Sequence, residues 1–303
     1  MNATVQSQQR NIQIGFLLAT GAALGFSIKA IFVKLAYAYH VDAITMLMFR
    51  MMFALPFFIV IVWLEERKAK SRIRRKDFIN ITLLGLVGYY CSSLLDFMGL
   101  MYITTGLERL ILFLFPTMVV FISAVFLGKR IQKEAYIALA LSYMGIIVAM
   151  ANDVQISGEH VLLGSALVFV ATITYSVFLV GSGKIIPKVG ARKFTAYAMI
   201  VSCIAVIIQF GITHDTASFN QPVEVYAYGF AMAVFSTVLP AFMLAAAMHR
   251  IGASKTSIIS GLGPVATIVL AAIFLAEPLT LIQVVGAALV MAGVHILGKS
   301  KNK

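Results

Sequence analysis

Five charged side chains lie inside long apolar stretches in the first half of the chain: Lys29, Arg50, Asp96, Glu108 and Arg109. If these stretches are membrane helices, such charges are costly, and they mark ion pairs, ligand sites or proton relays. Three positive groups against two carboxylates suit an anionic or zwitterionic ligand. Asp96 or Glu108 could also exchange a proton, because a partly desolvated carboxylate has a tunable pKa.

Two interpretations of these five charges stay open. In the first, they pair only with one another and fix the register of neighbouring helices. In the second, they line an outward-facing vestibule and bind substrate. Glu108 and Arg109 are adjacent and point about 100° apart on a helix, so they cannot face the same partner. Lys34 is close enough to a helix end to extend its ammonium group to the membrane interface.

Further polar residues are candidates for the same site. Tyr89 precedes Asp96 by two helical turns, so both residues lie on one helix face. Tyr175, Ser257 and Ser260 are polar positions in the second half of the chain. We predict that these four uncharged residues contribute to substrate or proton binding.

Two prolines, Pro116 and Pro264, each lie inside an apolar stretch. A proline removes a backbone donor, so the helix bends and carbonyl groups are freed at that point. We therefore predict helix kinks at both prolines, and we expect these kinks to serve gating.

No sequence pattern supports catalysis. His249 and His295 have no cysteine or carboxylate pair beside them, so a metal site is not expected. The segment Gly181-Ser182-Gly183-Lys184 lacks the spacing of a phosphate-binding loop. We predict that the protein is not an enzyme and uses no metal and no cofactor.

The composition indicates a polytopic membrane protein. Residues of the set AVILMFWYC make up 61% of the 303 residues, and only 12% are charged, whereas soluble domains carry about 25% charged residues. A membrane helix needs about 20 largely apolar residues. Ten stretches approach that length: Ile12–Ala38, Ala43–Leu64, Phe78–Tyr102, Gly106–Leu127, Glu134–Ala151, Val161–Gly183, Phe194–Ile212, Val225–Met248, Thr256–Ala276 and Leu281–Leu297.

The charge distribution predicts the orientation. Most of the 24 Lys and Arg residues lie in the chain ends and in alternate connections, above all between Arg67 and Lys76. Cytoplasmic segments retain Lys and Arg, so both termini are expected in the cytoplasm. The net charge of +12 is therefore a topology signal, and no nucleic-acid partner is expected. The predicted location is the bacterial cytoplasmic (inner) membrane.

An internal repeat relates the two halves of the sequence. Pro116 and Pro264 are 148 residues apart, as are Gly145 and Gly293. Five helices in each half is an odd number, so the second half must lie inverted relative to the first. The predicted fold is all-α, with ten transmembrane helices in two inverted five-helix repeats. The first repeat covers residues 1–153 and the second covers residues 154–303.

The end of the second repeat resembles a known family. The segments Phe274–Thr280, Gly286–Leu289 and Ala292–Val294 look like the end of an EamA-type repeat, and Arg50 in Met48-Phe49-Arg50 is similar to an arginine common in that family. The resemblance places the chain in the drug/metabolite transporter superfamily. It implies export or exchange of small metabolites, amino acids or drugs without ATP. Lys129 departs from the family pattern, which usually has Glu there.

The sequence thus predicts a secondary active transporter that exports a small polar metabolite, amino acid or organic anion by alternating access. Its expected partners are this substrate, protons and the lipid bilayer. Two alternatives remain: a non-transporting membrane sensor or assembly subunit, and a flippase for a lipid carrier.

Overall fold

The computed structural model describes residues 2–68, 73–128, 133–157, 159–260 and 262–300, and within these residues all regular structure is helical. The first half contains α1 (Asn2–Tyr37), α2 (Ala43–Lys68), α3 (Arg75–Gly85), the π-helical segment η1 (Leu86–Cys91), α4 (Ser92–Gly99), α5 (Thr105–Leu112), α6 (Phe115–Leu127) and α7 (Lys133–Ser157). The second half contains α8 (Val161–Val189), α9 (Ala191–Thr213), the 3₁₀ turn η2 (Thr216–Phe219), α10 (Val223–Ala233), the π-helical segment η3 (Val234–Val238), α11 (Leu239–Ser260), α12 (Gly263–Leu275) and α13 (Leu281–Ser300).

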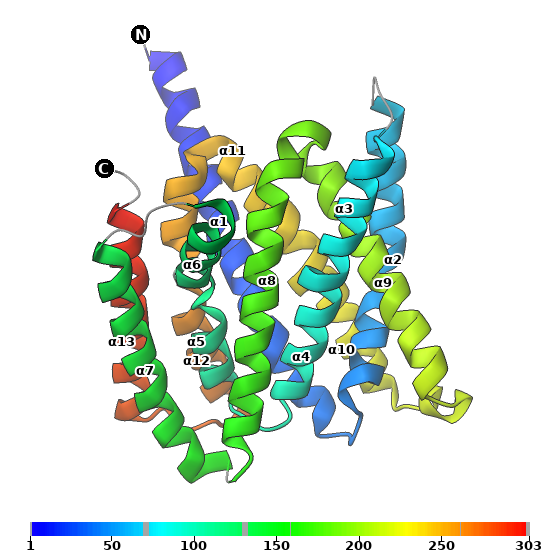
Figure 1. The fold of residues 1–303 in the computed structure, drawn as a ribbon, viewed down its shortest axis with the longest axis vertical. Helices are drawn as coiled ribbons and strands as arrows, with labels where there is room; N and C mark the ends of the chain where they lie inside the picture. The colour runs from blue at the N-terminus through cyan, green and yellow to red at the C-terminus, as the bar shows by residue number, and fades with distance from the viewer. Residues whose placement is uncertain (1, 69–72, 129–132, 158, 261, 301–303) are drawn as a thin grey trace.

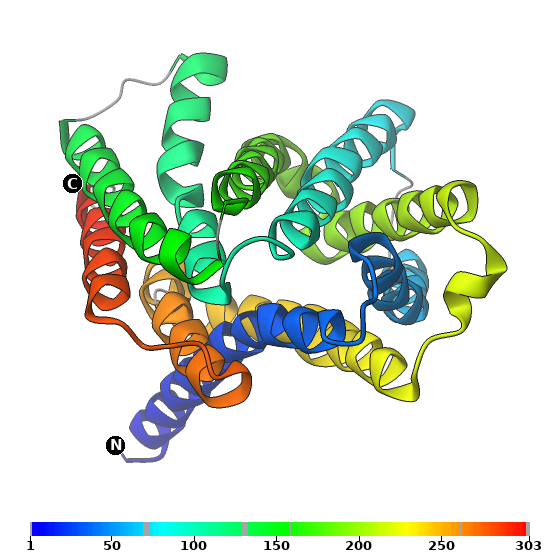
Figure 2. The same ribbon diagram turned by 90° about the horizontal axis from the view of Figure 1, so that it is seen from below.

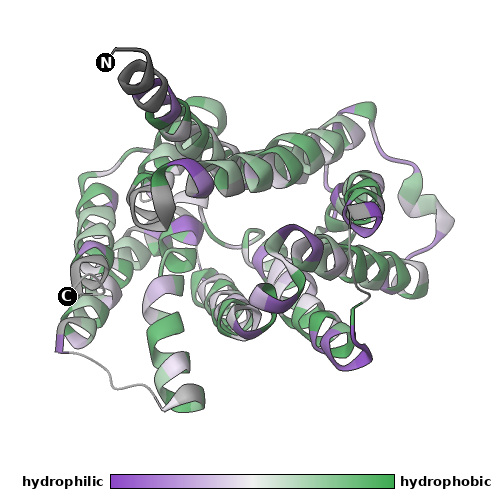
Figure 3. Cartoon of the chain, turned by 90° about the horizontal axis from the view of Figure 1, so that it is seen from above, coloured by the Kyte–Doolittle hydropathy of each residue, from purple (hydrophilic) through white to green (hydrophobic). Residues whose placement is uncertain are grey.

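Seven helical segments of the described chain are long and apolar enough to cross a membrane, and three further apolar helices are shorter. The shorter ones are Ala135–Ala151, Gly263–Leu275 and Leu281–Ile296. Large apolar side chains point outward, such as Ile212, which is 79% exposed. In Figure 3 the helix ribbons are mostly hydrophobic, and hydrophilic residues gather toward helix ends and turns. Apolar surface of this extent indicates contact with lipid.

The helices form two groups that pack against each other (Figures 1 and 2). Helix α1 packs along α10, η3, α11 and α12, and this set is called the α1 group. Helix α8 packs along α3, η1, α4, α5 and α6, and this set is called the α8 group. Each group therefore combines helices from both halves of the sequence. The pairs α2–α9 and α7–α13 flank the groups, and both chain ends lie at one end of the bundle.

The closest helix pair, α7 and α13, meets through glycine. A Cβ atom added to Gly145 would lie 2.5 Å from the carbonyl oxygen of Gly286, and one added to Gly293 would lie 2.5 Å from that of Ala138. Small residues permit this backbone approach inside a membrane. The two helices consequently behave as one packed unit.

Two expected helix boundaries differ from the structure. The predicted connection at residues 249–255 is wrong, because α11 is helical through to Ser260; this segment contains no proline to end the helix. The expected helix Gly106–Leu127 is interrupted at Phe113 and Leu114, between α5 and α6. Two π-helical segments also occur where regular helices were expected.

Candidate functional site

A buried ion-pair cluster joins the α1 and α8 groups. The Lys29 ammonium group of α1 contacts the Asp96 carboxylate of α4 and lies 2.9 Å from Oε1 of Glu108 in α5. The side chains of Lys29, Asp96 and Glu108 are 13%, 6% and 0% exposed. A charge placed there without a partner would be strongly destabilising. Three of the five charges therefore pair with one another, in a largely buried site.

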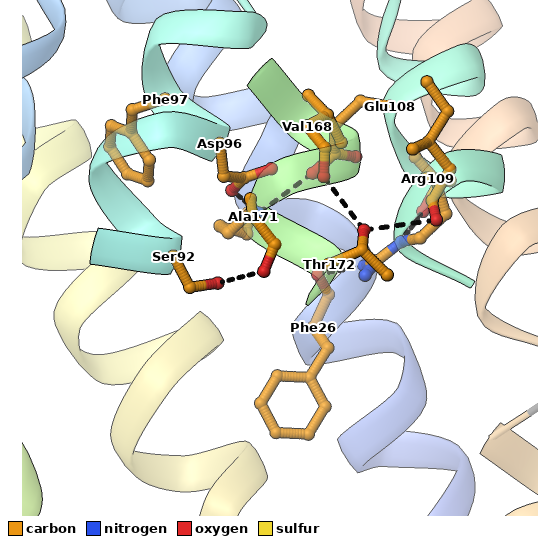
Figure 4. Close-up of polar contacts among 12 residues, drawn as sticks. Phe26, Ser92, Asp96, Phe97, Glu108, Arg109, Val168, Ala171 and Thr172 are labelled. Atoms are coloured by element: carbon orange, nitrogen blue, oxygen red, sulfur yellow. Dashed lines mark hydrogen bonds and ion pairs between the residues drawn. The ribbon is translucent and has the colours of Figure 1, made fainter. Parts of the chain in front are cut away.

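The two carboxylates of the cluster keep unused hydrogen-bonding capacity. Oδ1 of Asp96 and Oε2 of Glu108 are buried and have no hydrogen-bond partner among the residues that the structure describes. Figure 4 shows Asp96 and Glu108 on either side of the α8 segment that carries Val168 and Thr172. A buried acceptor without a donor costs free energy. The cluster is therefore suited to accept a proton or a donor group of a ligand.

Arg109 lies beside the cluster but has different partners, as its position on the helix requires. Its Nε lies 3.0 Å from the Thr267 hydroxyl of α12, and its Nη2 donates to the carbonyl oxygen of Phe26 in α1. Arg109 belongs to the α8 group, and both partners belong to the α1 group. Arg109 is thus a second polar contact across the same boundary.

Arg50, Tyr89 and Tyr175 extend the polar region away from the cluster. Arg50 Nε lies 3.0 Å from the Thr237 hydroxyl, and the guanidinium group lies 5.5 Å from the centre of the Phe97 ring. The rings of Tyr89 and Tyr175 both pack against Phe178, at 4.7 and 5.9 Å between ring centres. These three residues make no direct contact with Lys29 within the hydrogen bonds and ion pairs of the described chain.

Ser257 and Ser260 belong to the last turns of α11, and their side chains lie outside the described residues. The expected contribution of their hydroxyl groups stays a prediction.

The two prolines occupy helix starts instead of mid-helix kinks. Pro116 lies in the first turn of α6 and Pro264 in the first turn of α12. A first-turn proline loses no helical hydrogen bond, so the chain breaks before each proline and a new helix begins. The break before Pro116 lies inside the apolar segment Thr105–Phe126.

Hydroxyl groups from the opposite half of the sequence lie within hydrogen-bond reach of backbone carbonyls at these breaks. The Ser27 hydroxyl of α1 lies 3.0 Å from the carbonyl oxygen of Gly263 and 2.8 Å from that of Ala23 in its own helix. In α8, the Ser176 hydroxyl lies 3.4 Å from the carbonyl oxygen of Phe115 and the Thr172 hydroxyl 3.3 Å from that of Ile111, and both lie closer to carbonyls of α8, at 2.7 and 2.9 Å. Each hydroxyl has one proton, which is shared between the two acceptors. Interrupted helices in a membrane need such donors.

The end of the bundle opposite the termini contains polar contacts that sequence analysis missed. Asp153 of α7 accepts hydrogen bonds from the backbone and hydroxyl of Thr104, at 2.8 and 2.7 Å. Glu277, which follows α12, accepts from the backbone and hydroxyl of Thr105, at 3.2 and 2.9 Å. Burial raises the pKa of Asp153 above its ordinary value, although its hydrogen bonds from Thr104 oppose that shift. The only sequence signal was threonine before a helix, a typical N-cap.

The chain matches known transporter sequences along most of its length. The model of the EamA-like transporter family matches residues 13–151 and 162–298. The uncharacterized transporter YcbK of Bacillus subtilis is 28% identical over 94% of this chain and 93% of its own length. The uncharacterized transporter YyaM of the same organism is 25% identical, over 78% and 77%.

A solved crystal structure shares the fold. It superposes with a TM-score of 0.66 at 14% sequence identity and covers 95% of this chain and 99% of its own. Identity this low is evidence for the fold alone.

Proposed function

The chain belongs to the EamA-like transporter family, and from that premise we propose that it is a secondary active transporter. It moves a small polar metabolite, amino acid or organic anion out of the cell by alternating access. The observation that carries the proposal is the contact of Lys29 with Asp96 and Glu108, because the α1 group supplies the cation and the α8 group supplies both anions. Movement of one group against the other would open this site.

Two inverted repeats, residues 1–153 and 154–303, account for the arrangement. Four pairs of helices begin 148 residues apart: α2 and α9, α3 and α10, α6 and α12, and α7 and α13. The π-helical segments η1 and η3 begin with the same separation. Gly128 and Ala276, which end α6 and α12 with positive φ, are also 148 residues apart. This constant separation supports a gap-free duplication.

The orientation follows from charge. Lys and Arg gather in connections on one side of the predicted topology, so that side is cytoplasmic and carries both termini. The contacts of Asp153 and Glu277 then lie on the outer side of the bacterial inner membrane. A transport route from the cytoplasm ends at these contacts.

Proton binding at the cluster would couple to substrate binding. A proton taken up by Glu108 or Asp96 neutralises that carboxylate and weakens its attraction to the Lys29 ammonium group. Lys29 keeps its other carboxylate partner, while the neutralised carboxyl no longer attracts an amino group of the substrate. Uptake of a proton from outside therefore favours release of the substrate there, and loss of that proton to the cytoplasm restores the carboxylate for the next substrate. One proton enters the cell for each substrate molecule that leaves.

Transport can be tested with purified protein. A thermal-shift screen of amino acids, amines and organic anions identifies ligands, and each ligand is then tested for counterflow in proteoliposomes. We expect saturable counterflow of at least one ligand, and loss of that activity in Asp96→Asn and Glu108→Gln without loss of folded protein. Glu159→Gln, an exposed carboxylate outside the site, is the matched control and should retain transport.

Two results would contradict the proposal. The first is a broad screen without any transported ligand, together with lipid movement in a scramblase assay. The second is undiminished counterflow in both carboxylate variants.

A further inference from the structure

Hydrogen bonds of Thr104 and Thr105 tie the start of α5 to α7 and to the segment that follows α12. Asp153 binds Thr104 and Glu277 binds Thr105, each through one backbone and one hydroxyl donor. Thr104, Thr105 and Asp153 are 5%, 0% and 1% exposed, so water scarcely competes for the bonds of Asp153, whereas Glu277 is half-buried. Hydrogen bonds to a carboxylate are stronger than neutral ones.

The hydrogen bonds of Thr104 and Thr105 lie close in the helix to Glu108, a member of the buried cluster. The amide of Glu108 donates to the carbonyl oxygen of Thr104 at 3.0 Å, and the amide of Leu107 donates to the Thr104 hydroxyl at 3.2 Å. Glu108 therefore lies one helical turn from the tied residues. A displacement of this turn displaces the Glu108 carboxylate from Lys29.

A second cation, Lys34 of α1, lies in the electrostatic field of these carboxylates. Lys34 is attracted by Glu277, Asp153 and Glu108, and it forms no ion pair within the described part of the chain. Lys34 and Glu277 are both half-buried, and α1 packs along α12, the helix that Glu277 follows. Lys34 is an alternative partner for Glu277.

We propose that Asp153 and Glu277 form an outer latch. In the closed state the latch holds the start of α5 and positions Glu108 against Lys29, which seals the site from outside. When the site opens outward, Thr105 leaves Glu277, and Lys34 pairs with the freed carboxylate. This inference rests on the proposed transport function and its orientation.

Solvent access to the site tests the latch without a known substrate. Thr267, which contacts Arg109 and is 0% exposed, is replaced by cysteine in a Cys91→Ala, Cys203→Ala background. A membrane-impermeant methanethiosulfonate reagent is added outside intact cells, and the labelling rate is measured. If the latch is closed, the Thr267→Cys protein should be labelled more slowly than the same protein with a weakened latch.

Latch variants should change that rate in opposite directions. Thr105→Val and Asp153→Asn each weaken the closed state and leave the Lys34–Glu277 pair of the open state intact, so labelling should accelerate by about tenfold or more, as expected for loss of a charge-assisted hydrogen bond. Lys34→Gln weakens the open state and should slow labelling. Thr105→Ser keeps the hydroxyl and should label at the parent rate, as should Glu159→Gln.

Labelling at the parent rate in folded Thr105→Val and Asp153→Asn proteins would overturn the latch. If these two variants do not fold, Lys34→Gln decides, and an unchanged or faster rate overturns the proposal. The expected labelling pattern without counterflow of any ligand would retain the latch and reject the transport function. Counterflow of a ligand, together with unchanged labelling in the latch variants, would retain the transport function and reject the latch.

Discussion

Lys29 and Glu108 lie 2.9 Å apart across the boundary between the α1 and α8 groups, although 79 residues separate them in the sequence. The same ammonium group also contacts Asp96. One cation therefore pairs with two buried carboxylates that belong to the opposite group. This relationship makes the cluster both a structural link and a site whose opening requires the groups to separate.

Replacing Lys29 should be more damaging than replacing either carboxylate. Lys29→Met leaves two buried anions without their partner, and we expect a loss of about 3–5 kcal/mol in the free energy of unfolding. Glu108→Gln leaves the Lys29–Asp96 pair intact and should cost less. The measurement is denaturant unfolding in detergent. The double variant Lys29→Met/Glu108→Gln should be more stable than Lys29→Met alone, and an equal or lower stability would contradict the assigned pairing.

The packing of α7 on α13 depends on glycine at position 145, where a side chain would collide with the backbone of α13. Gly145→Val would force atoms against the backbone of Gly286, and we expect a loss of about 2–3 kcal/mol from overpacking. Gly183→Ala is the control, because nothing lies within 4 Å of its added Cβ atom. Thermal midpoints of both variants in detergent provide the comparison. Equal midpoints would show that the close approach is not required.

Asp42 should stabilise the start of α2 in a pH-dependent way. Burial alone would raise the pKa of Asp42, but hydrogen bonds from Thr45 and Ile44 and the nearby His214 ring lower it below its ordinary value. A carboxyl with a lowered pKa contributes stability above its unfolded value, and that stability is lost as the pH falls through the folded value. Asp42→Asn should therefore destabilise the protein at neutral pH.

The expected cost of Asp42→Asn is about 0.3–1 kcal/mol, the usual value of a negative charge at a helix N-terminus, because asparagine still caps the helix and the Asp42 side chain is 46% exposed. Unfolding of the parent and variant is compared between pH 7 and pH 3. The difference should shrink as the pH falls below the ordinary Asp value of about 3.9. A difference that grows toward low pH would contradict the sign of the shift.

The Ser27 hydroxyl should matter more than the Ser176 hydroxyl at the two helix breaks. Ser27 lies 3.0 Å from the carbonyl oxygen of Gly263, whereas Ser176 lies 3.4 Å from that of Phe115. We expect Ser27→Ala to lose about 1 kcal/mol of stability, the usual value of a buried hydrogen bond, and Ser176→Ala to lose less. Unfolding in detergent measures both. Ser218→Ala, in the exposed turn η2, is the control and should be neutral.

The sequence predicted the apolar helices, and that buried charges need a partner or water, for physical reasons that act locally. An apolar stretch of sufficient length predicts a membrane helix by itself, and an intramembrane charge such as Asp96 is costly when it stands alone. The identity of its partner was left open, because Lys29, Arg50 and Arg109 were all available. Only the packing of α1 beside α4 and α5 distinguishes them.

Other features could not be predicted because their cause is not local. Asp153 and Glu277 occur in polar connections, where a solvated carboxylate is the ordinary expectation. Their threonine partners are 49 and 172 residues away. The π-helical segments leave no mark in apolar periodicity. The break before Pro116 was expected as a kink, since the sequence does not show whether neighbouring hydroxyls can satisfy freed carbonyls.

The central claim is that the boundary between the two groups opens alternately to each side of the membrane. Labelling of the Thr267→Cys reporter from both sides tests it most directly, with an impermeant reagent applied to intact cells and to inside-out vesicles. We predict labelling from each side, with a transported ligand shifting the ratio of the two rates. Labelling from one side only, or from neither, would contradict the claim.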